Sequence, residues 1–253
     1  MTSKKWDAYF KTFLDIDGFS SIDNSLNGLQ VDNDGSEIQK IVFAVDASLE
    51  TFERAAAAGA GMLFVHHGLF WGKSLALLDS HRKRIKCLLD NNIALYAVHL
   101  PLDQHPELGN NAALIRLLGV EHPEPFGNFR GRMVGYKGAL ASPLTIEDAV
   151  KNITFMGRPP SGVYAFGKRE NATCAVISGG GADDAFEAIG DGIDLYVTGE
   201  MKHSVYHYIQ ESGLNMIAGG HYSTEVWGVR RVMERAASDF GTEVEFIDVP
   251  TGL

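Results

Sequence analysis

The chain has 253 residues, of which 45% are hydrophobic, and its 32 acidic and 22 basic residues give a formal net charge of −10. A chain of this length and hydrophobic content can bury a substantial core, in one large domain or in two compact ones. An acidic chain lacks the general attraction to phosphate backbones on which nucleic-acid binding depends, so DNA and RNA are poor candidates for its partner.

The N-terminal stretch "MTSKKWDAYFKTFLDIDGF" has the pattern of an amphipathic helix and lacks the uninterrupted apolar core of a secretory signal. No segment approaches the ~20 apolar residues that cross a bilayer, so no membrane association is expected. Cys87 and Cys174 are too few and too far apart for a disulfide framework or a thiolate zinc site. These features predict a cytoplasmic protein.

Short apolar runs alternate with helix-period runs along the first half, a pattern typical of parallel β-α-β units. Each predicted strand is followed by a predicted helix. The strands are "KIVFAVDAS" (40–48), "MLFVHHG" (62–68) and "IALYAVHLP" (93–101), and the helices are "LETFERAAAAG" (49–59), "LLDSHRKRIKCLLDNN" (77–92) and "NNAALIRLLG" (110–119).

The second half repeats this rhythm. After a strand, a helix and a strand at 132–140, 145–153 and 162–167, the pattern predicts strands at 172–180, 194–200, 215–220 and 244–250. The expected helices between them are 183–192, 202–213 and 224–241. "GVYAFGKRENATCAVISGG" (162–180) predicts a hairpin that turns on "KREN".

The two halves share one skeleton, because "FAVDAS" corresponds to "AVISGG", "FVHHG" to "YVTGE" and "YAVHLP" to "IAGGHY". We therefore predict an α/β fold of two similar three-layer α/β/α modules with mixed, mostly parallel sheets that face a shared metal-site crevice. The first module spans residues 1–125 plus 221–253 and carries most of the metal ligands, and the second spans 126–220. The ordinary similarity of any two β-α-β units is the alternative explanation of the correspondence.

Open α/β sheets place their sites outside the carboxyl ends of the strands, and polar residues collect at those ends here. Asp46 ends the first predicted strand, His66 and His67 end the second, and His99 ends the third. Adjacent residues of a regular strand point to opposite faces. For His66 and His67 to serve one cluster, the chain must bend near Gly68, or each must bind a different metal.

Two further stretches add donors to the tandem histidines. In "GGHYSTEVWG", His221 and Glu225 are four residues apart at the start of a helical pattern, so both can reach one ion, although such pairs also arise by chance. Asp103 follows the strand that Pro101 ends, where an aspartate can simply cap a loop.

Together these stretches supply three imidazoles and two carboxylates. A catalytic zinc ion needs only three protein ligands, so five donors fit two ions that share a water or hydroxide. Nitrogen and oxygen donors without thiolate favour two divalent ions from among zinc, iron, manganese, cobalt and nickel.

The chain resembles the NIF-three-like dinuclear metal-centre family, whose members are often named GTP cyclohydrolase 1 type 2 homologues. The stretches that carry the resemblance are "NGLQV" (27–31), "HHGLFW" (66–71), "HLPLDQHPELGNNA" (99–112), "TGE" (198–200) and "GHYSTE" (220–225). The resemblance implies metal ligands at His66, His67, Asp103, His221 and Glu225, with Glu225 bridging. It also implies a homohexamer, a trimer of dimers, with its metal sites facing an internal cavity.

Residues around these ligands are the candidates for catalysis. His99 can orient a metal-bound group, and Glu200 and His203 can serve as base and acid beside a bridging hydroxide. The alternative for His99 is an ordinary buried histidine, and the alternative for Glu200 is a glutamate that caps a helix. The glycine-rich stretch 178–184 resembles an anion-binding loop, but its aspartates oppose phosphate binding. Asn27 fits a turn, and Phe70 and Trp71 fit the core or a subunit contact.

Two functions of different classes fit this site. The first is a metal-dependent hydrolase acting on a nucleotide-like substrate, which the resemblance specifies as opening of the purine imidazole ring of GTP. The second is a non-catalytic metal-binding scaffold that interacts with other proteins. A nucleic-acid-handling role is disfavoured by the net charge, unless positive residues line a cavity.

Overall fold

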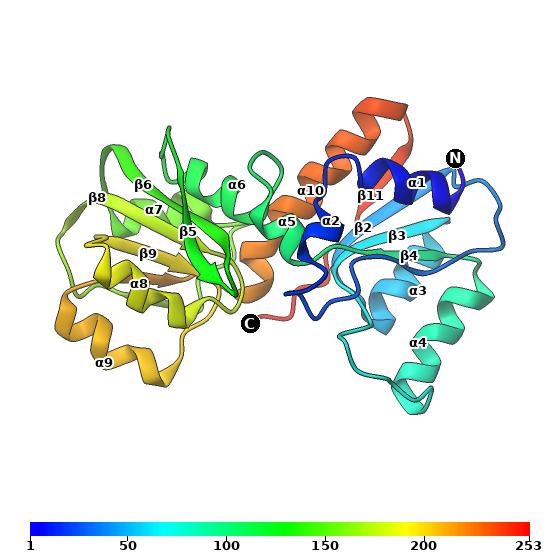
Figure 1. Ribbon diagram of the computed structural model, residues 1–253, viewed down its shortest axis with the longest axis horizontal. Coiled ribbons are helices and arrows are strands. Elements are labelled where there is room, and N and C mark those ends of the chain that lie inside the picture. The colour runs from blue at the N-terminus through cyan, green and yellow to red at the C-terminus, as the bar shows by residue number, and fades with distance from the viewer. The chain divides into compact units, whose positions relative to one another are not determined.

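The computed structural model describes residues 1–253, which form two compact units. Unit 1 comprises Met1–Leu102 and Val229–Val249, and unit 2 comprises Asp103–Gly228 and Pro250–Leu253. Each unit is built on its own mixed β-sheet with helices against it (Figure 1), so the predicted α/β class is confirmed. The predicted module boundaries, 126 and 221, differ from this division. Residues 103–125 belong to unit 2 because the helix at 110–117 packs on the second sheet.

The sheet of unit 1 has the strand order β1-β4-β3-β2-β11. β2, β3, β4 and β11 run parallel to one another, and only β1, which pairs with β4, is antiparallel. The register aligns Asp46, the last residue of β2, with His67, the last residue of β3. The strands are β1 (Gly28–Val31), β2 (Lys40–Asp46), β3 (Met62–His67), β4 (Ala94–Ala97) and β11 (Glu243–Phe246).

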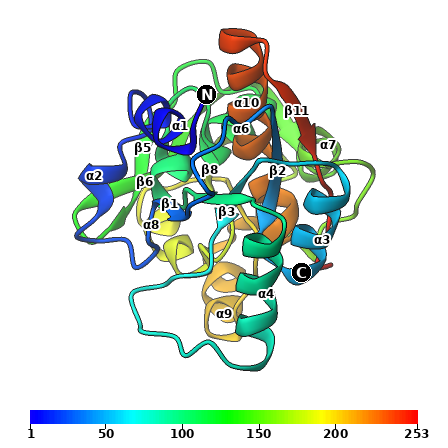
Figure 2. The ribbon, with the colours of Figure 1, turned by 90° about the vertical axis from the view of Figure 1, so that its right-hand side faces the viewer.

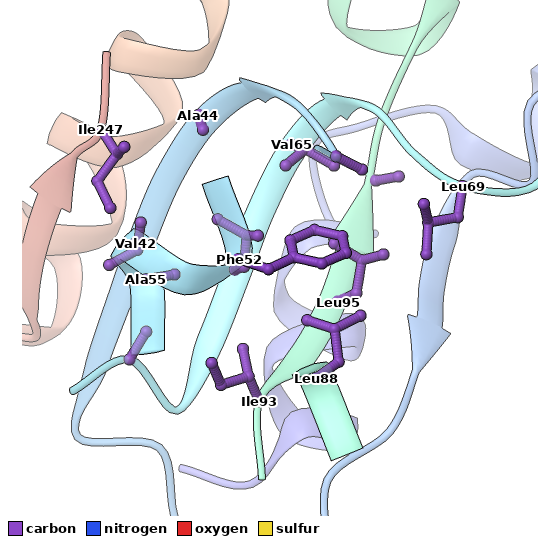
Figure 3. Packing of buried hydrophobic residues seen from close by; sticks show 14 residues of the cluster. Val42, Ala44, Phe52, Ala55, Val65, Leu69, Leu88, Ile93, Leu95 and Ile247 are labelled. Atoms are coloured by element: carbon purple, nitrogen blue, oxygen red, sulfur yellow. The ribbon is translucent and has the colours of Figure 1, made fainter. Parts of the chain in front are cut away.

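Both faces of this sheet are covered, which explains why its central strands are continuous apolar runs. On one face, Phe52 of α3 (Leu49–Ala57) and Leu88 of α4 (Asp79–Asp90) pack on Val42, Val65 and Leu95 (Figure 3). The other face carries α1 (Ser3–Phe10), on the side opposite α3 and α4 (Figures 1 and 2).

The α1 face is an aromatic cluster. The ring of Phe10 lies 5.1 Å from that of Phe64 and 4.9 Å from that of Tyr96. Trp6 contacts Phe240 at the end of α10 (His221–Phe240), with ring centroids 5.2 Å apart. A short helix, α2 (Ile16–Phe19), follows α1 and leads into β1.

The sheet of unit 2 has the order β5-β6-β8-β9-β10-β7, in which β8, β9 and β10 are parallel and the outer strands antiparallel. Helices α6 and α7 pack on one face, and α8 and α9 lie together against the other (Figure 1). The strands are β5 (Glu124–Phe129), β6 (Arg132–Thr145), β7 (Gly162–Tyr164), β8 (Glu170–Ile177), β9 (Leu195–Thr198) and β10 (Asn215–Ala218). The helices of unit 2 are α6 (Asn110–Leu117), α7 (Ile146–Ile153), η1 (Ala182–Asp184), α8 (Ala185–Gly190) and α9 (His203–Ser212). α5 (Leu100–Gln104) and α10 (His221–Phe240) each contain residues of both units.

The predicted hairpin at 162–180 is wrong, because β7 pairs with β10 and not with β8. The buried side chain of Asn215 accounts for this connection. Its Oδ1 accepts a hydrogen bond from Gly167 N at 2.8 Å, and its Nδ2 donates to Lys168 O at 2.7 Å. These bonds hold the turn after β7 against the start of β10.

No helix in the structure combines the length and the apolar character that crossing a membrane requires.

The two cysteines are both reduced thiols, in different surroundings. Burial in β8 raises the pKa of the Cys174 thiol to about 12, while Cys87 on α4 is only partly buried. Because the thiolate is the reactive form, iodoacetamide at neutral pH is expected to label Cys87 slowly and Cys174 only after unfolding. Intact-mass and peptide mass spectrometry would check this, and rapid labelling of native Cys174 would contradict the packing described.

Candidate metal centre

The tandem histidines lie together at the end of β3, with ring centroids 4.6 Å apart. Nδ1 of His66 lies 2.8 Å from the carbonyl oxygen of Val98, and Nδ1 of His67 lies 2.8 Å from Oδ1 of Asp46. Gly68 follows directly, and a Cβ there would overlap the side chain of Gln30 and the Cβ of Ala97. Glycine at 68 therefore lets the chain leave the strand where the two imidazoles converge.

His99 is the third imidazole of this cluster, and it is fixed at two points. Its backbone N–H donates to Oδ1 of Asn27 at 2.7 Å, and its Nδ1 lies 3.0 Å from Oδ1 of Asp23. The indole of Trp71 packs edge-on against it, with ring centroids 5.0 Å apart. Asn27 thus does more than shape a turn, and Trp71 covers an imidazole instead of joining the core.

Asp23 holds His99 and the neighbouring backbone of unit 1 in place through several hydrogen bonds. Its carboxylate also accepts hydrogen bonds from Ser25 N (2.9 Å), Asn27 Nδ2 (2.9 Å) and Leu100 N (3.1 Å). Burial acts to raise the pKa of Asp23, but His99 and the surrounding donors outweigh it and lower the pKa to about 2. The carboxylate is therefore ionised at neutral pH and acts only as an acceptor.

His66, His67 and His99 form the first donor group, whose ligand atoms all lie within 4.8 Å of one another. In each ring Nδ1 faces an oxygen, and a carbonyl or an ionised carboxylate can only accept. Nδ1 therefore carries the proton in the neutral imidazole. The lone pair is left on Nε2, the arrangement found in metal-ligating histidines.

In unit 2, Glu225 lies next to two further candidate donors, Asp103 and His221, and we call these three residues the second donor group. His221 and Glu225 occupy successive turns of α10, and their Nε2 and Oε2 atoms lie 3.3 Å apart. A carboxylate oxygen of Asp103 lies within 4.8 Å of one of Glu225. The carboxylate of Glu225 is thus adjacent to both other members of the group. Both carboxylates are buried.

Glu200, which follows β9, fixes the orientation of His221. Its Oε1 lies 2.5 Å from Nδ1 of that imidazole, the same relation that Asp46 has to His67. Burial acts to lower the pKa of His221, but Glu225 and Glu200 outweigh it and raise the pKa to about 9. The metal-free ring is therefore protonated at neutral pH, and a metal ion that binds its Nε2 would replace that proton. His203, the first residue of α9, is exposed.

Asp103 is held by residues that sequence reasoning did not single out as functional. Its Oδ1 accepts hydrogen bonds from Asn110 Nδ2 at 2.9 Å and from Ser178 Oγ at 3.0 Å. Ser178 is placed in turn by its backbone N–H, which donates to Oδ1 of Asn111 at 2.6 Å. In the sequence, the two adjacent asparagines at the start of α6, Asn110 and Asn111, are the feature from which this arrangement could have been predicted.

The glycine-rich stretch after β8 lies against the second donor group. Gly179 has a φ of +61°, and a Cβ there would overlap Oε1 of Glu225 and lie 3.1 Å from Nε2 of His221. Its N–H donates to Oγ1 of Thr224 at 3.0 Å. The absence of a side chain at 179 leaves room for the side chains of Glu225 and His221.

The donor sets fit divalent transition metals. The first group offers three imidazoles. The second offers one imidazole and two carboxylates, so neither contains a thiol. Three or four such donors hold zinc in proteins, and imidazole and carboxylate also bind iron, manganese, cobalt and nickel. The oxygen atoms that fix each imidazole complete this fit.

The chain is similar to known proteins along its whole length. A family model described as Duf34/NIF3 (NGG1p interacting factor 3) matches residues 1–252. The chain is 40% identical to a protein of Treponema pallidum and 39% identical to one of Archaeoglobus fulgidus, both named GTP cyclohydrolase 1 type 2 homolog. These alignments cover 100% of both chains in the first case and 97% of both in the second.

Solved structures agree with this relationship. The crystal structure of TTHA1606 from Thermus thermophilus matches with a TM-score of 0.91 and 36% identity over 100% of both chains. Reduced HcgD from Methanocaldococcus jannaschii matches with a TM-score of 0.86 and 29% identity over 98% of both chains. The predicted resemblance is thereby confirmed, and the chain belongs to the DUF34/NIF3 family.

Proposed function

We propose that the protein is a metal-dependent hydrolase that binds two divalent ions and acts on a nucleotide-like substrate. The proposed ligands are His66, His67, Asp103, His221 and Glu225. One observation carries the proposal. Every imidazole of the two donor groups has its Nδ1 next to an oxygen acceptor, which leaves Nε2 as a metal ligand. The name shared by the relatives, GTP cyclohydrolase 1 type 2 homolog, supports a nucleotide substrate.

Bound divalent ions would lower the pKa of water and stabilise the anion that forms during hydrolysis. The chain's own residues prepare the site for them. Asp46 and Glu200 hold the rings of His67 and His221 in one orientation, and Asn110 keeps Asp103 in place. The position of Glu225 next to two other donors supports its proposed bridging role.

The other proposed roles concern proton transfer and orientation. We assign to Glu200 the orientation of His221 and a role as base, and to the exposed His203 the role of acid. His99, fixed by Asp23, is assigned a place at the first donor group. A loss of turnover with unchanged metal content in H203A would support the acid role of His203.

A cytoplasmic homohexamer, a trimer of dimers, is part of the same proposal. Three leucines of the segment before α4 support self-association, because Leu75, Leu77 and Leu78 are 49%, 55% and 66% exposed. Exposed apolar side chains that gather in one segment are typical of interaction surfaces. Light scattering coupled to size exclusion would measure the assembly, and a monomer would contradict it.

The hydrolase proposal is tested by stripping the protein with a chelator and reloading it with zinc, iron, manganese, cobalt or nickel singly. Each form is then assayed with GTP and with phosphoesters. Turnover with at least one metal is expected, and E225Q should abolish it while the assembly stays intact. E234Q, at an exposed position of the same helix, is the matched control.

The outcome also separates the two functional classes. If the loaded protein retains its metals but turns over no substrate with any of them, the hydrolase proposal fails. A non-catalytic metal-binding scaffold would then be the better description.

A further inference from the structure

A cavity of about 300 Å³ lies in unit 2, beside the first turn of α10. Its walls come from three segments of the chain, 158–161, 220–223 and 250–253. This volume is at the lower end of the range for pockets that bind small organic molecules. Arg158 is the only lining residue with a charged side chain, so the side chains around the cavity favour an anion.

The guanidinium of Arg158 lies against two aromatic rings. Its central carbon is 5.4 Å from the ring centre of Phe155 and 5.9 Å from that of Tyr222, and both of these residues are buried. A guanidinium stacks through its flat face, whereas its N–H groups lie in its plane and match two oxygens of a phosphate or carboxylate. Contact with two buried rings therefore restricts the plane in which Arg158 presents these N–H groups.

A strained turn brings Arg158 to these rings. Met156 and Gly157 have positive φ angles, +50° and +73°, and the N–H of Arg158 donates to the carbonyl oxygen of Phe155 at 3.1 Å. Methionine rarely adopts this left-handed conformation, and the side chain of Met156 is 71% exposed, so its own packing does not stabilise the turn. Strained residues of this kind concentrate at ligand-binding sites, and this one places Arg158 at the cavity wall.

The wall that carries Arg158 is tied to the strand leading into the second donor group. Ser161 Oγ donates to the carbonyl oxygen of Ala218, the last residue of β10, at 2.9 Å. Gly220 and Tyr222, which line the cavity, are the neighbours of His221 in the chain. An anion bound in the cavity would therefore lie next to the second donor group.

We propose that this cavity binds the phosphate group of the nucleotide-like substrate through Arg158, which makes Arg158 a specificity-determining residue. The inference rests on the proposed function for the identity of the ligand. The lining contains no acidic residue, unlike the glycine-rich stretch 178–184 with its Asp183 and Asp184. Phosphate is therefore bound at the arginine, and the glycine-rich stretch is left to accommodate Glu225 and His221.

The test is a calorimetric titration of the chelator-stripped full chain with GMP and with guanosine at neutral pH. Metal-free protein is used so that coordination of phosphate by a metal ion does not contribute. The unsubstituted chain should bind GMP more tightly than guanosine, and R158M should weaken GMP binding by about 10- to 100-fold. R158K keeps the charge but not the paired N–H groups, so it should recover only part of that loss.

The matched control is R130M. Arg130 is an exposed residue of the same unit, its guanidinium carbon lies 5.1 Å from the ring centre of Phe129, and it does not line the cavity. R130M should bind GMP as tightly as the unsubstituted chain. Equal weakening in R130M and R158M would show a general attraction of charge and would overturn the inference.

Two other results would also overturn it. One is a folded R158M, judged by circular dichroism, that binds GMP as tightly as the unsubstituted chain, and the other is an unsubstituted chain that does not prefer GMP to guanosine. If R158M does not fold, R158K decides, because unchanged GMP affinity in that variant rejects the paired contact. If GMP binds through Arg158 but the metal-loaded protein turns over no substrate, the hydrolase proposal fails and the phosphate site stands.

Discussion

Replacement of Gly179 with alanine is expected to weaken metal binding at the second donor group by about 10- to 100-fold, the loss typical of perturbed supporting residues. A Cβ at 179 would overlap Oε1 of Glu225 and crowd Nε2 of His221. The carboxylate must then move away from the position that the metal requires. The φ of +61° adds strain of about 1–2 kcal/mol for a residue with a side chain.

The neighbouring residue supplies the matched control. A Cβ added at Gly180 meets nothing within 4 Å, and G180A makes the same chemical change one position along the chain. Calorimetric titration of both variants with Zn²⁺ should show the loss in G179A alone. Equal affinities in the two variants would show that Gly179 does not shape the donor group.

Replacement of Leu88 with alanine should lower the free energy of unfolding by about 2–5 kcal/mol. Leu88 is completely buried between α4 and the sheet of unit 1, where it belongs to the cluster around Phe52 (Figure 3). Its removal leaves a cavity that the packed strands cannot close. The adjacent Leu89 is 60% exposed on the same helix, so L89A should change the stability by no more than about 0.5 kcal/mol.

Equilibrium unfolding in urea, followed by far-ultraviolet circular dichroism, would measure both changes. The comparison is well matched, because the two substitutions remove the same atoms from neighbouring positions of one helix. A similar loss in both variants would mean that α4 does not pack on the sheet through Leu88.

The local order of strands and helices was predictable, since it follows from apolar periodicity along short stretches. Asp46, His66 and His67 were expected at strand ends and lie there, and His99 lies two residues after the end of β4. The pairing of β7 was not predictable, because it depends on how the side chain of Asn215 holds Gly167 and Lys168, 48 and 47 residues away.

The residues that hold the candidate ligands could not be predicted from the sequence for the same reason. Asp23 contacts His99 across 76 positions, and Ser178 contacts Asp103 across 75. No periodicity connects residues so far apart. The role of Gly179 depends on its distance from Glu225 in space, and a glycine-rich stretch alone equally suggests an anion-binding loop. The candidate ligands could be recognised because their residue types are rare in combination, whereas the residues that hold them are common polar residues.

The most direct test of the central claim is the metal content of freshly purified protein, combined with anomalous scattering from its crystals at the absorption edge of that metal. The account predicts two ions per chain, with the Nε2 atoms of His66, His67 and His221 and the carboxylates of Asp103 and Glu225 among their ligands. Protein that contains no stoichiometric metal, or ions bound away from these side chains, would contradict it.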